Sequence, residues 1–295
     1  MCCCVALALD LWCASAQAVT LAEHAKQHTI KLFIPAKGAE MPNTIDKPAH
    51  LQLGDKALLL SGLGLTDLAG ISKLLVEDDG KQVPVTSVAN LHLYVNQNKL
   101  AALPGEIGAL KNVVFFYCEY NKLSTLPRAL MDMDNLIAMY FTGNEFTEIP
   151  PFVFDMTRLR KMQFSKNRIG VLPAEIGRLK ELRHFNIAGN QIAVLPDSIA
   201  KLTRLRVCDL SDNRLTALPD AFGNVRIENQ LRVRNNPLTS LPAGFAKMRA
   251  TIDITGTKID PLSLPPELRA KISTEKPPGS KDEDKIIVKR PSKIK

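Results

Sequence analysis

The feature that most constrains how this chain can fold is a regular spacing of asparagines. Seven of them lie 23 residues apart without a slip: Asn98, Asn121, Asn144, Asn167, Asn190, Asn213 and Asn236. The same apolar frame surrounds each one, and one full unit reads Leu182-x-x-Phe185-x-Ile187-x-x-Asn190-x-Ile192-x-x-Leu195-Pro196. A fixed period of this length is the signature of a repeat protein, in which each unit buries its apolar face only by stacking on its neighbours.

The spacing within one unit predicts its local structure. Phe185 and Ile187 are two residues apart, so both side chains lie on the same face of a short strand. The chain then turns at Asn190, and we expect the asparagine amide to be buried and to pair with backbone groups that the turn leaves unsatisfied. Less regular units stand at the two ends, around Leu58–Leu68 and Ile252–Leu262, and an insertion after the first contains Glu77–Lys81, which predicts a protruding hairpin.

The pattern resembles the leucine-rich-repeat family, and within it the 23-residue class with the motif L-P-x-x-I-G-x-L-x-x-L. The segment Leu172–Leu182 matches this motif almost letter for letter, as does Leu103–Leu110, and the resemblance covers about residues 58–264. It implies an α/β solenoid, a curved array with a parallel β-sheet on the concave face and irregular or short helical segments on the convex side. It also implies that protein binding is the usual role.

The remaining segments give the domain organisation. Residues 1–18 are interpreted as a signal peptide, because an apolar run at Cys2–Leu9 is followed by an A-x-A cleavage pattern ending at Ala18. No basic residue precedes that run and Asp10 interrupts it, so a periplasmic or secreted location is predicted with a cytoplasmic one as the alternative. Residues 19–57 are predicted to cap the N-terminal end of the repeats at 58–264, residues 265–272 to cap the other end, and residues 273–295 to form a disordered basic tail.

Catalytic, metal and cofactor sites are not predicted. Cys118 and Cys208 fall on inward-facing positions, where a thiol acts as a small hydrophobe. His24 and His28 are two ligands where zinc needs more. The net charge of +8 favours an acidic partner, but no nucleic-acid module and no transmembrane segment is recognisable, and the oligomeric state is not predicted.

A row of tyrosines is the first candidate binding site. The central outward position of successive strands is occupied by Tyr94, Tyr117 and Tyr140, which we expect to be exposed on the concave face, with Phe115 and Tyr120 beside them. Tyrosine is enriched at interaction hot spots, which favours a binding patch. The alternative is that tyrosine suits strands and that the rings stabilise one another.

A row of arginines is the second candidate. Arg160, Arg183 and Arg206 share the position at the entry to three successive strands. Stacked like charges repel, so we expect Asp209 to supply part of the compensation. Either an acidic partner contacts these arginines or they form an ordinary solvated rim. The sequence therefore predicts a non-catalytic protein-binding module, with carbohydrate or cell-wall binding through the tyrosines as the alternative.

Overall fold

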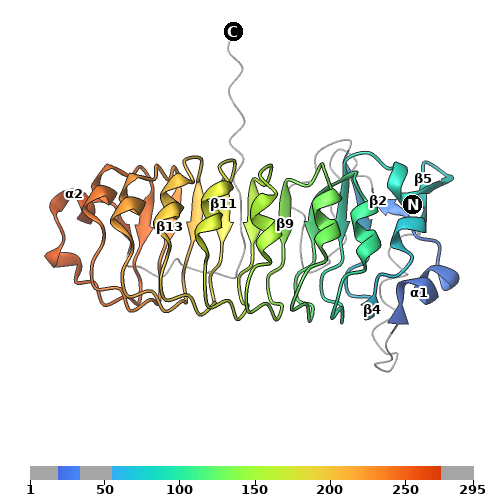
Figure 1. The fold of residues 1–295 in the computed structure, drawn as a ribbon, viewed down its shortest axis with the longest axis horizontal. Coiled ribbons are helices and arrows are strands. Elements are labelled where there is room, and N and C mark those ends of the chain that lie inside the picture. Colours follow the sequence, from blue (N-terminus) through green and yellow to red (C-terminus); the bar gives the residue numbers. More distant parts are fainter. Residues whose placement is uncertain (1–18, 34–54, 274–295) are drawn as a thin grey trace, which may run out of the picture.

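The computed structural model describes residues 19–33 and 55–273, and it shows a solenoid. Short strands stand side by side along the long axis, from the N-terminal end at the right of Figure 1 to the C-terminal end at the left. The predicted leucine-rich-repeat solenoid is thereby confirmed. The predicted signal peptide, part of the predicted N-terminal cap and nearly all of the predicted basic tail lie outside the described residues.

The main sheet has 11 strands in the order β15-β14-β13-β12-β11-β10-β9-β8-β7-β3-β2. Its pairs are parallel except that of β2 with β3, and equivalent repeat positions face each other, as Met162, Phe185 and Cys208 do. This register follows from the constant repeat length. The strands are β2 (Leu32–Phe33), β3 (Lys56–Leu59), β7 (Leu91–Tyr94), β8 (Val113–Tyr117), β9 (Ala138–Tyr140), β10 (Lys161–Gln163), β11 (His184–Asn186), β12 (Val207–Asp209), β13 (Gln230–Arg232), β14 (Thr251–Asp253) and β15 (Ile272–Ser273).

Short 3-10 helices form the convex side of the array. In the regular repeats each helix directly follows a proline, which belongs to a Leu-Pro pair in all of them except η7, where the pair is Ile149-Pro150. The restricted φ of proline suits this N-cap position. The helices are η5 (Gly105–Ala109), η6 (Arg128–Asp132), η7 (Pro151–Asp155), η8 (Ala174–Arg178), η9 (Asp197–Lys201), η10 (Asp220–Asn224) and η11 (Ala243–Lys247). Less regular units add η3 (Ile71–Lys73), η4 (Val85–Ser87) and η12 (Pro261–Ser263).

The ladder asparagines are buried and pair with backbone groups, as predicted, and they also join neighbouring repeats. The Asn167 side chain, which is 7% exposed, accepts a hydrogen bond from the Phe146 backbone N–H at 3.1 Å. Its amide nitrogen donates to the carbonyls of Phe141 and Phe164, both at 3.0 Å. The other six asparagines are 2–7% exposed and make equivalent bonds, except that the Asn121 amide donates to the Cys118 Sγ and not to the Cys118 carbonyl. One side chain per repeat thus satisfies backbone groups of two turns.

Both ends of the array carry additional elements. At the N-terminal end, α1 (Leu21–Gln27) begins with a capping box between Thr20 and Glu23, and β1 (Val19–Thr20) pairs with β4 (Leu65–Asp67). The predicted hairpin is present as antiparallel β5 (Leu75–Asp78) and β6 (Lys81–Pro84). At the other end, α2 (Pro266–Arg269) precedes β15.

Close contact between convex helices gives a first prediction. A Cβ atom on Gly108 of η5 would overlap the Ala129 carbonyl oxygen of η6 and lie 3.0 Å from the Ala129 Cβ, whereas one on Gly105 of the same helix would meet nothing within 4 Å. We expect Gly108→Ala to lower the free energy of unfolding by about 1–3 kcal/mol through overpacking. Gly105→Ala is expected to be neutral or to stabilise by about 0.4–1 kcal/mol. Urea unfolding of both variants is the measurement, and equal midpoints would show that the helices do not touch there.

Candidate binding surface

The concave face of the sheet presents two columns of outward-facing side chains along its strands. The first column runs through His92, Phe115, Ala138, Lys161, His184, Val207, Gln230 and Thr251. The second, central column runs through Tyr94, Tyr117, Tyr140, Gln163, Asn186, Asp209, Arg232 and Asp253. Along the columns the face changes from aromatic to polar and basic, and then to a network of ion pairs.

The three central tyrosines form the predicted ladder, but they are not exposed. The Tyr117 ring stacks on Tyr94 with centroids 4.2 Å apart and on Tyr140 at 4.3 Å, nearly parallel in both cases. Their exposed fractions are 3% for Tyr94, 6% for Tyr117 and 5% for Tyr140, so the prediction of an open aromatic patch is wrong. The physical reason is that each ring covers its neighbour while the apolar side chains of Phe33 and Leu59 pack against the row.

These residues form a second, smaller hydrophobic core, which we call the aromatic cluster. It comprises Ala57, Tyr94, Tyr117, Ala138 and Tyr140, with Phe33, Leu59 and Phe115 packed against it. The Phe115 ring also stacks on His92, with centroids 4.4 Å apart. Tyr120 does not belong to the cluster: it lies at a turn with φ of 52°, is 43% exposed, and its ring lies over Gly143 of the next repeat.

Burial changes the protonation equilibria of the aromatic region. Desolvation, with a smaller contribution from Tyr94, raises the pKa of the Tyr117 phenol well above its ordinary value. His92, which lies beside Phe115 in the first column, is 1% exposed. Its burial lowers the pKa of its imidazole to about 4, although the Asp55 carboxylate lies 3.5 Å from its Nε2 and opposes the shift. His92 is therefore a neutral, buried part of this end of the sheet at neutral pH.

The arginine row lies where the sequence predicts it, at the entry to β10, β11 and β12. The backbone N–H of Arg183 donates to the Arg160 carbonyl at 2.8 Å, and that of Arg206 donates to the Arg183 carbonyl at 2.7 Å. The Arg206 guanidinium pairs with Glu228 at 3.1 Å, whereas Arg160 and Arg183 make no ion pair or side-chain hydrogen bond with any described residue. We call these three residues the basic ladder.

His184 reports the electrostatic environment beside the basic ladder. Burial lowers the pKa of its imidazole to about 4, and the positive charges of Lys161, Arg206 and Arg183 lower it further. The Lys161 ammonium also lies 5.8 Å from the centre of the Phe115 ring. The middle of the concave face is therefore a region of positive potential that begins where the aromatic cluster ends.

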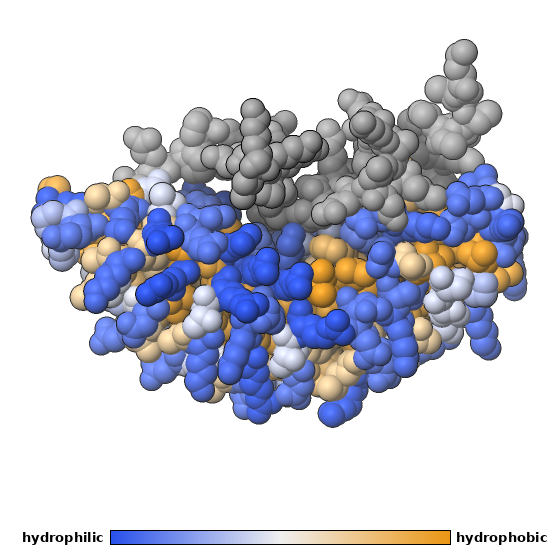
Figure 2. Space-filling model, turned by 90° about the horizontal axis from the view of Figure 1, so that it is seen from above, coloured by the Kyte–Doolittle hydropathy of each residue, from blue (hydrophilic) through white to orange (hydrophobic). Residues whose placement is uncertain are grey.

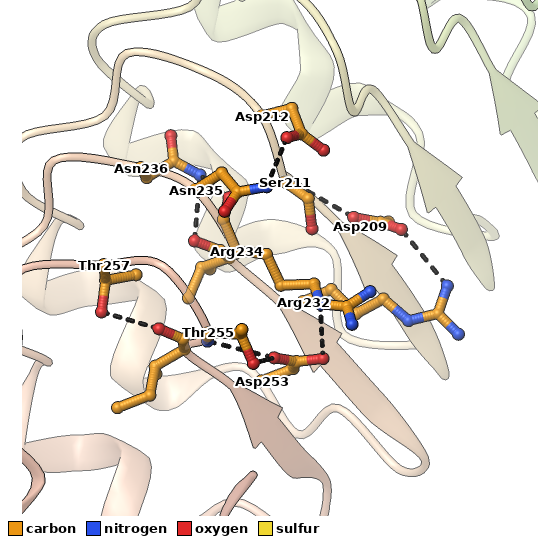
Figure 3. A network of polar contacts seen from close by, with 12 residues as sticks. Asp209, Ser211, Asp212, Arg232, Arg234, Asn235, Asn236, Asp253, Thr255 and Thr257 are labelled. Atoms are coloured by element: carbon orange, nitrogen blue, oxygen red, sulfur yellow. Dashed lines mark hydrogen bonds and ion pairs between the residues drawn. The ribbon is translucent and has the colours of Figure 1, made fainter. Parts of the chain in front are cut away.

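Ion pairs fill the C-terminal part of the concave face. Arg232 pairs with Asp209 at 3.3 Å and Arg234 with Asp253 at 2.9 Å, and Figure 3 shows these two pairs on adjacent strands. Asp209 is 8% exposed and Asp253 is 4% exposed, so both carboxylates of these ion pairs are buried. Asp209 compensates Arg232 rather than the basic ladder, because they are direct cross-strand neighbours. The alternation of Asp209, Arg232 and Asp253 in one column was the sequence signal for this network.

Figure 2 looks onto the upper edge of the array. It shows strongly hydrophilic side chains gathered over the middle and an apolar patch toward the N-terminal end. The character of this edge therefore changes along the array.

Comparisons with known proteins identify the fold. A family model for the leucine rich repeat matches residues 204–225, and no curated protein matches the chain. A solved leucine-rich-repeat protein of Leptospira interrogans is 23% identical with a TM-score of 0.51, and the match covers 67% of this chain and 60% of that one. The chain has the leucine-rich-repeat fold.

Two solved receptors are also similar to this chain. The ectodomain of the Arabidopsis thaliana membrane receptor kinase GASSHO1/SCHENGEN3, solved in complex with CASPARIAN STRIP INTEGRITY FACTOR 2, is 20% identical with a TM-score of 0.54. That match covers 73% of this chain and 29% of the receptor. A TDR receptor is 23% identical with a TM-score of 0.52, covering 59% of this chain and 32% of that one. The chain thus spans between 29% and 60% of the length of these three solved proteins.

The described part of this chain holds no group of three or more His, Cys, Asp or Glu side chains placed to bind a metal ion. Nor does that part contain a helix of the length and apolar character that crossing a membrane requires. Cys118 and Cys208 are fully buried free thiols, and burial raises the pKa of both far above the ordinary value. The described surface is built from ion pairs, amides and guanidinium groups, which are suited to recognition.

Proposed function

We propose that this leucine-rich-repeat protein is a non-catalytic protein-recognition module whose partner contacts the concave face over β10–β12. The observation that supports the proposal is a polar surface on a continuous hydrogen-bonded sheet. Lys161, Gln163, His184 and Asn186 are half-buried there, with Arg160 exposed beside them. Polar groups held on a rigid sheet lose little conformational entropy on binding, which favours specific recognition.

The two flanking regions are less suited to first contact. The aromatic cluster has its ring faces against one another, and the C-terminal carboxylates are already bonded to Arg232 and Arg234. A solvent-exposed site with unsatisfied charge gains more from a partner than a region whose groups are paired. The Arabidopsis ectodomain, whose fold is similar, was solved in complex with a factor that it binds, which is consistent with this use of the fold.

Carbohydrate binding through the tyrosines has less support. Stacking on a sugar needs an exposed ring face, and the three tyrosines are at most 6% exposed. For these three rings a role in the internal packing of the concave face is the better interpretation, and the candidate contact residues are Arg160, Arg183 and Arg206.

Site-specific photocrosslinking tests the proposed function. The photoreactive residue p-benzoylphenylalanine replaces Gln163 on the concave face or, as the control, the exposed Lys180 on the convex side. The full chain carrying each is irradiated in cells that express it. We expect a discrete protein adduct from position 163 and none of that mass from position 180. The same adduct from both positions, or one from position 180 alone, would place the partner elsewhere.

A further inference from the structure

The positive charge at the middle of the sheet differs from the positive charge at its C-terminal end. Arg232 and Arg234 each pair with a carboxylate on an adjacent strand. Arg160 and Arg183 pair with no described residue, and the one described carboxylate partner in the basic ladder belongs to Arg206. Since ladders of like charge on adjacent strands are destabilising, the unpaired part of the basic ladder costs stability in the isolated chain.

The spacing of the basic ladder is fixed by the sheet. The backbone hydrogen bonds that join residues 160, 183 and 206 place them on consecutive strands, and strands are about 4.8 Å apart, so the three positions span about 10 Å. Adjacent guanidinium groups can therefore reach two anions of one ligand. In an extended peptide, side chains at alternate positions lie about 6.6 Å apart on the same side, which these long side chains can match.

The groups beside the basic ladder fit a peptide. Gln163 and Asn186 lie next in the central column, and each amide offers both a donor and an acceptor. The Asn186 oxygen accepts from the Ala188 backbone at 3.0 Å, which leaves its amide nitrogen available for a carbonyl. A peptide backbone presents N–H and C=O groups that such amides complement, whereas a polyphosphate presents acceptors alone.

We propose that the basic ladder of Arg160, Arg183 and Arg206 is the docking site for an extended acidic peptide segment of the partner, whose carboxylates at alternate positions bind adjacent guanidinium groups. This inference rests on the proposed function and specifies its partner. The carboxylates relieve the repulsion within the basic ladder, and guanidinium–carboxylate pairs are charge-assisted and often bidentate. His184, whose imidazole burial keeps neutral, interacts electrostatically with Lys161, Arg206 and Arg183 and therefore senses a charge that binds beside them.

The experiment uses the full chain and a defined probe. Fluorescein-labelled Glu-Thr-Glu-Thr-Glu-Thr is titrated with the protein by fluorescence anisotropy, alongside the same peptide with Gln in place of Glu and a labelled polyphosphate of equal charge. The variant is the double substitution Arg160→Gln and Arg183→Gln. The matched control is Arg168→Gln with Arg214→Gln, which removes the same charge from exposed residues that directly follow the ladder asparagines.

We expect the Glu peptide to bind and the Gln peptide not to bind. The basic-ladder variant should weaken binding by about tenfold or more, and the control pair by less than about twofold, since long-range charge alone is screened at physiological salt. The His184 imidazole resonances, assigned with His184→Gln, should shift as the peptide is added, and the pKa of the imidazole should rise.

Three outcomes would overturn the proposal. They are equal weakening by the two double variants, tighter binding of polyphosphate than of the peptide, and no binding of the Glu peptide. The photocrosslinking result separates this inference from the proposed function. An adduct at position 163 without peptide binding would leave protein recognition intact and exclude the acidic segment. Peptide binding without an adduct at position 163 would support the acidic-peptide site and contradict the proposed contact of a protein partner over β10–β12.

Discussion

Replacing Tyr117 with alanine is expected to lower the free energy of unfolding by about 3–5 kcal/mol, the usual cost of truncating a buried aromatic residue. The Tyr117 ring is the middle member of the stack, with neighbours at 4.2 and 4.3 Å, and it is 6% exposed. Its removal opens a cavity between two rings that β7 and β9 hold in place. Equilibrium denaturation followed by circular dichroism is the measurement.

Two further variants separate packing from other effects. Tyr117→Phe keeps the ring and nearly all of the side-chain volume and removes only the hydroxyl, so we expect a change below about 1 kcal/mol. Tyr120→Ala removes a 43% exposed ring outside the cluster and should cost much less than Tyr117→Ala. If Tyr117→Ala were as stable as the unchanged protein, the aromatic cluster would not act as a hydrophobic core. The tyrosines would then be better interpreted as a binding patch.

This expectation bears on how binding is tested. A variant that truncates all three tyrosines loses the packing that holds β7, β8 and β9 together. Loss of partner binding by that variant would therefore not show that the tyrosines contact the partner. Substitutions in the basic ladder avoid the difficulty, because Arg160 and Arg183 make no side-chain bond to a described residue.

The sequence predicted the inward half of the structure well. A constant repeat length allows only one register between neighbouring strands. The burial of Phe185, Ile187 and Asn190 therefore follows from their positions within the repeat. The burial of the Cys118 and Cys208 thiols follows from the same period. The hairpin of β5 with β6 follows from a local pattern, a turn sequence between two apolar runs.

The outward half depends on contacts that the period does not encode. The tyrosines are buried because three rings of equal size occupy one column and because Phe33, distant in sequence, packs against the cluster. His92 is buried beneath Phe115 and beside Asp55. Asp209 and Asp253 are buried because arginines on adjacent strands cover them. The exposure of a side chain on the concave face therefore depends on which side chains lie beside it on the adjacent strands.

Replacing Asn167 with alanine is expected to lower the free energy of unfolding by about 2–4 kcal/mol. The Phe146 N–H loses its acceptor, and a buried donor without a partner costs about 1–3 kcal/mol. The Phe141 and Phe164 carbonyls keep a partner, because the asparagines of the neighbouring repeats, Asn144 and Asn190, also donate to them. The remaining cost comes from the void left by a side chain that is 7% exposed.

The matched control is Asn135→Ala. The Asn135 amide donates one hydrogen bond to the Lys111 carbonyl at 2.9 Å in an exposed setting, so its loss should cost less than about 1 kcal/mol. Equal costs for Asn135→Ala and Asn167→Ala would mean that the ladder asparagines contribute no more than surface residues do.

The position of Asn167 in the array adds a second expected result. The stability of a repeat array is approximately a sum of repeats and nearest-neighbour interfaces, so a weakened interface in the middle uncouples the two sides. Cys118 and Cys208 are buried thiols on either side of Asn167, and each reacts only when its repeat opens. Alkylation followed by mass spectrometry across a urea series should give one midpoint for both thiols in the unchanged protein and two in Asn167→Ala. A single shared midpoint in the variant would show that cooperativity does not pass through the asparagine ladder.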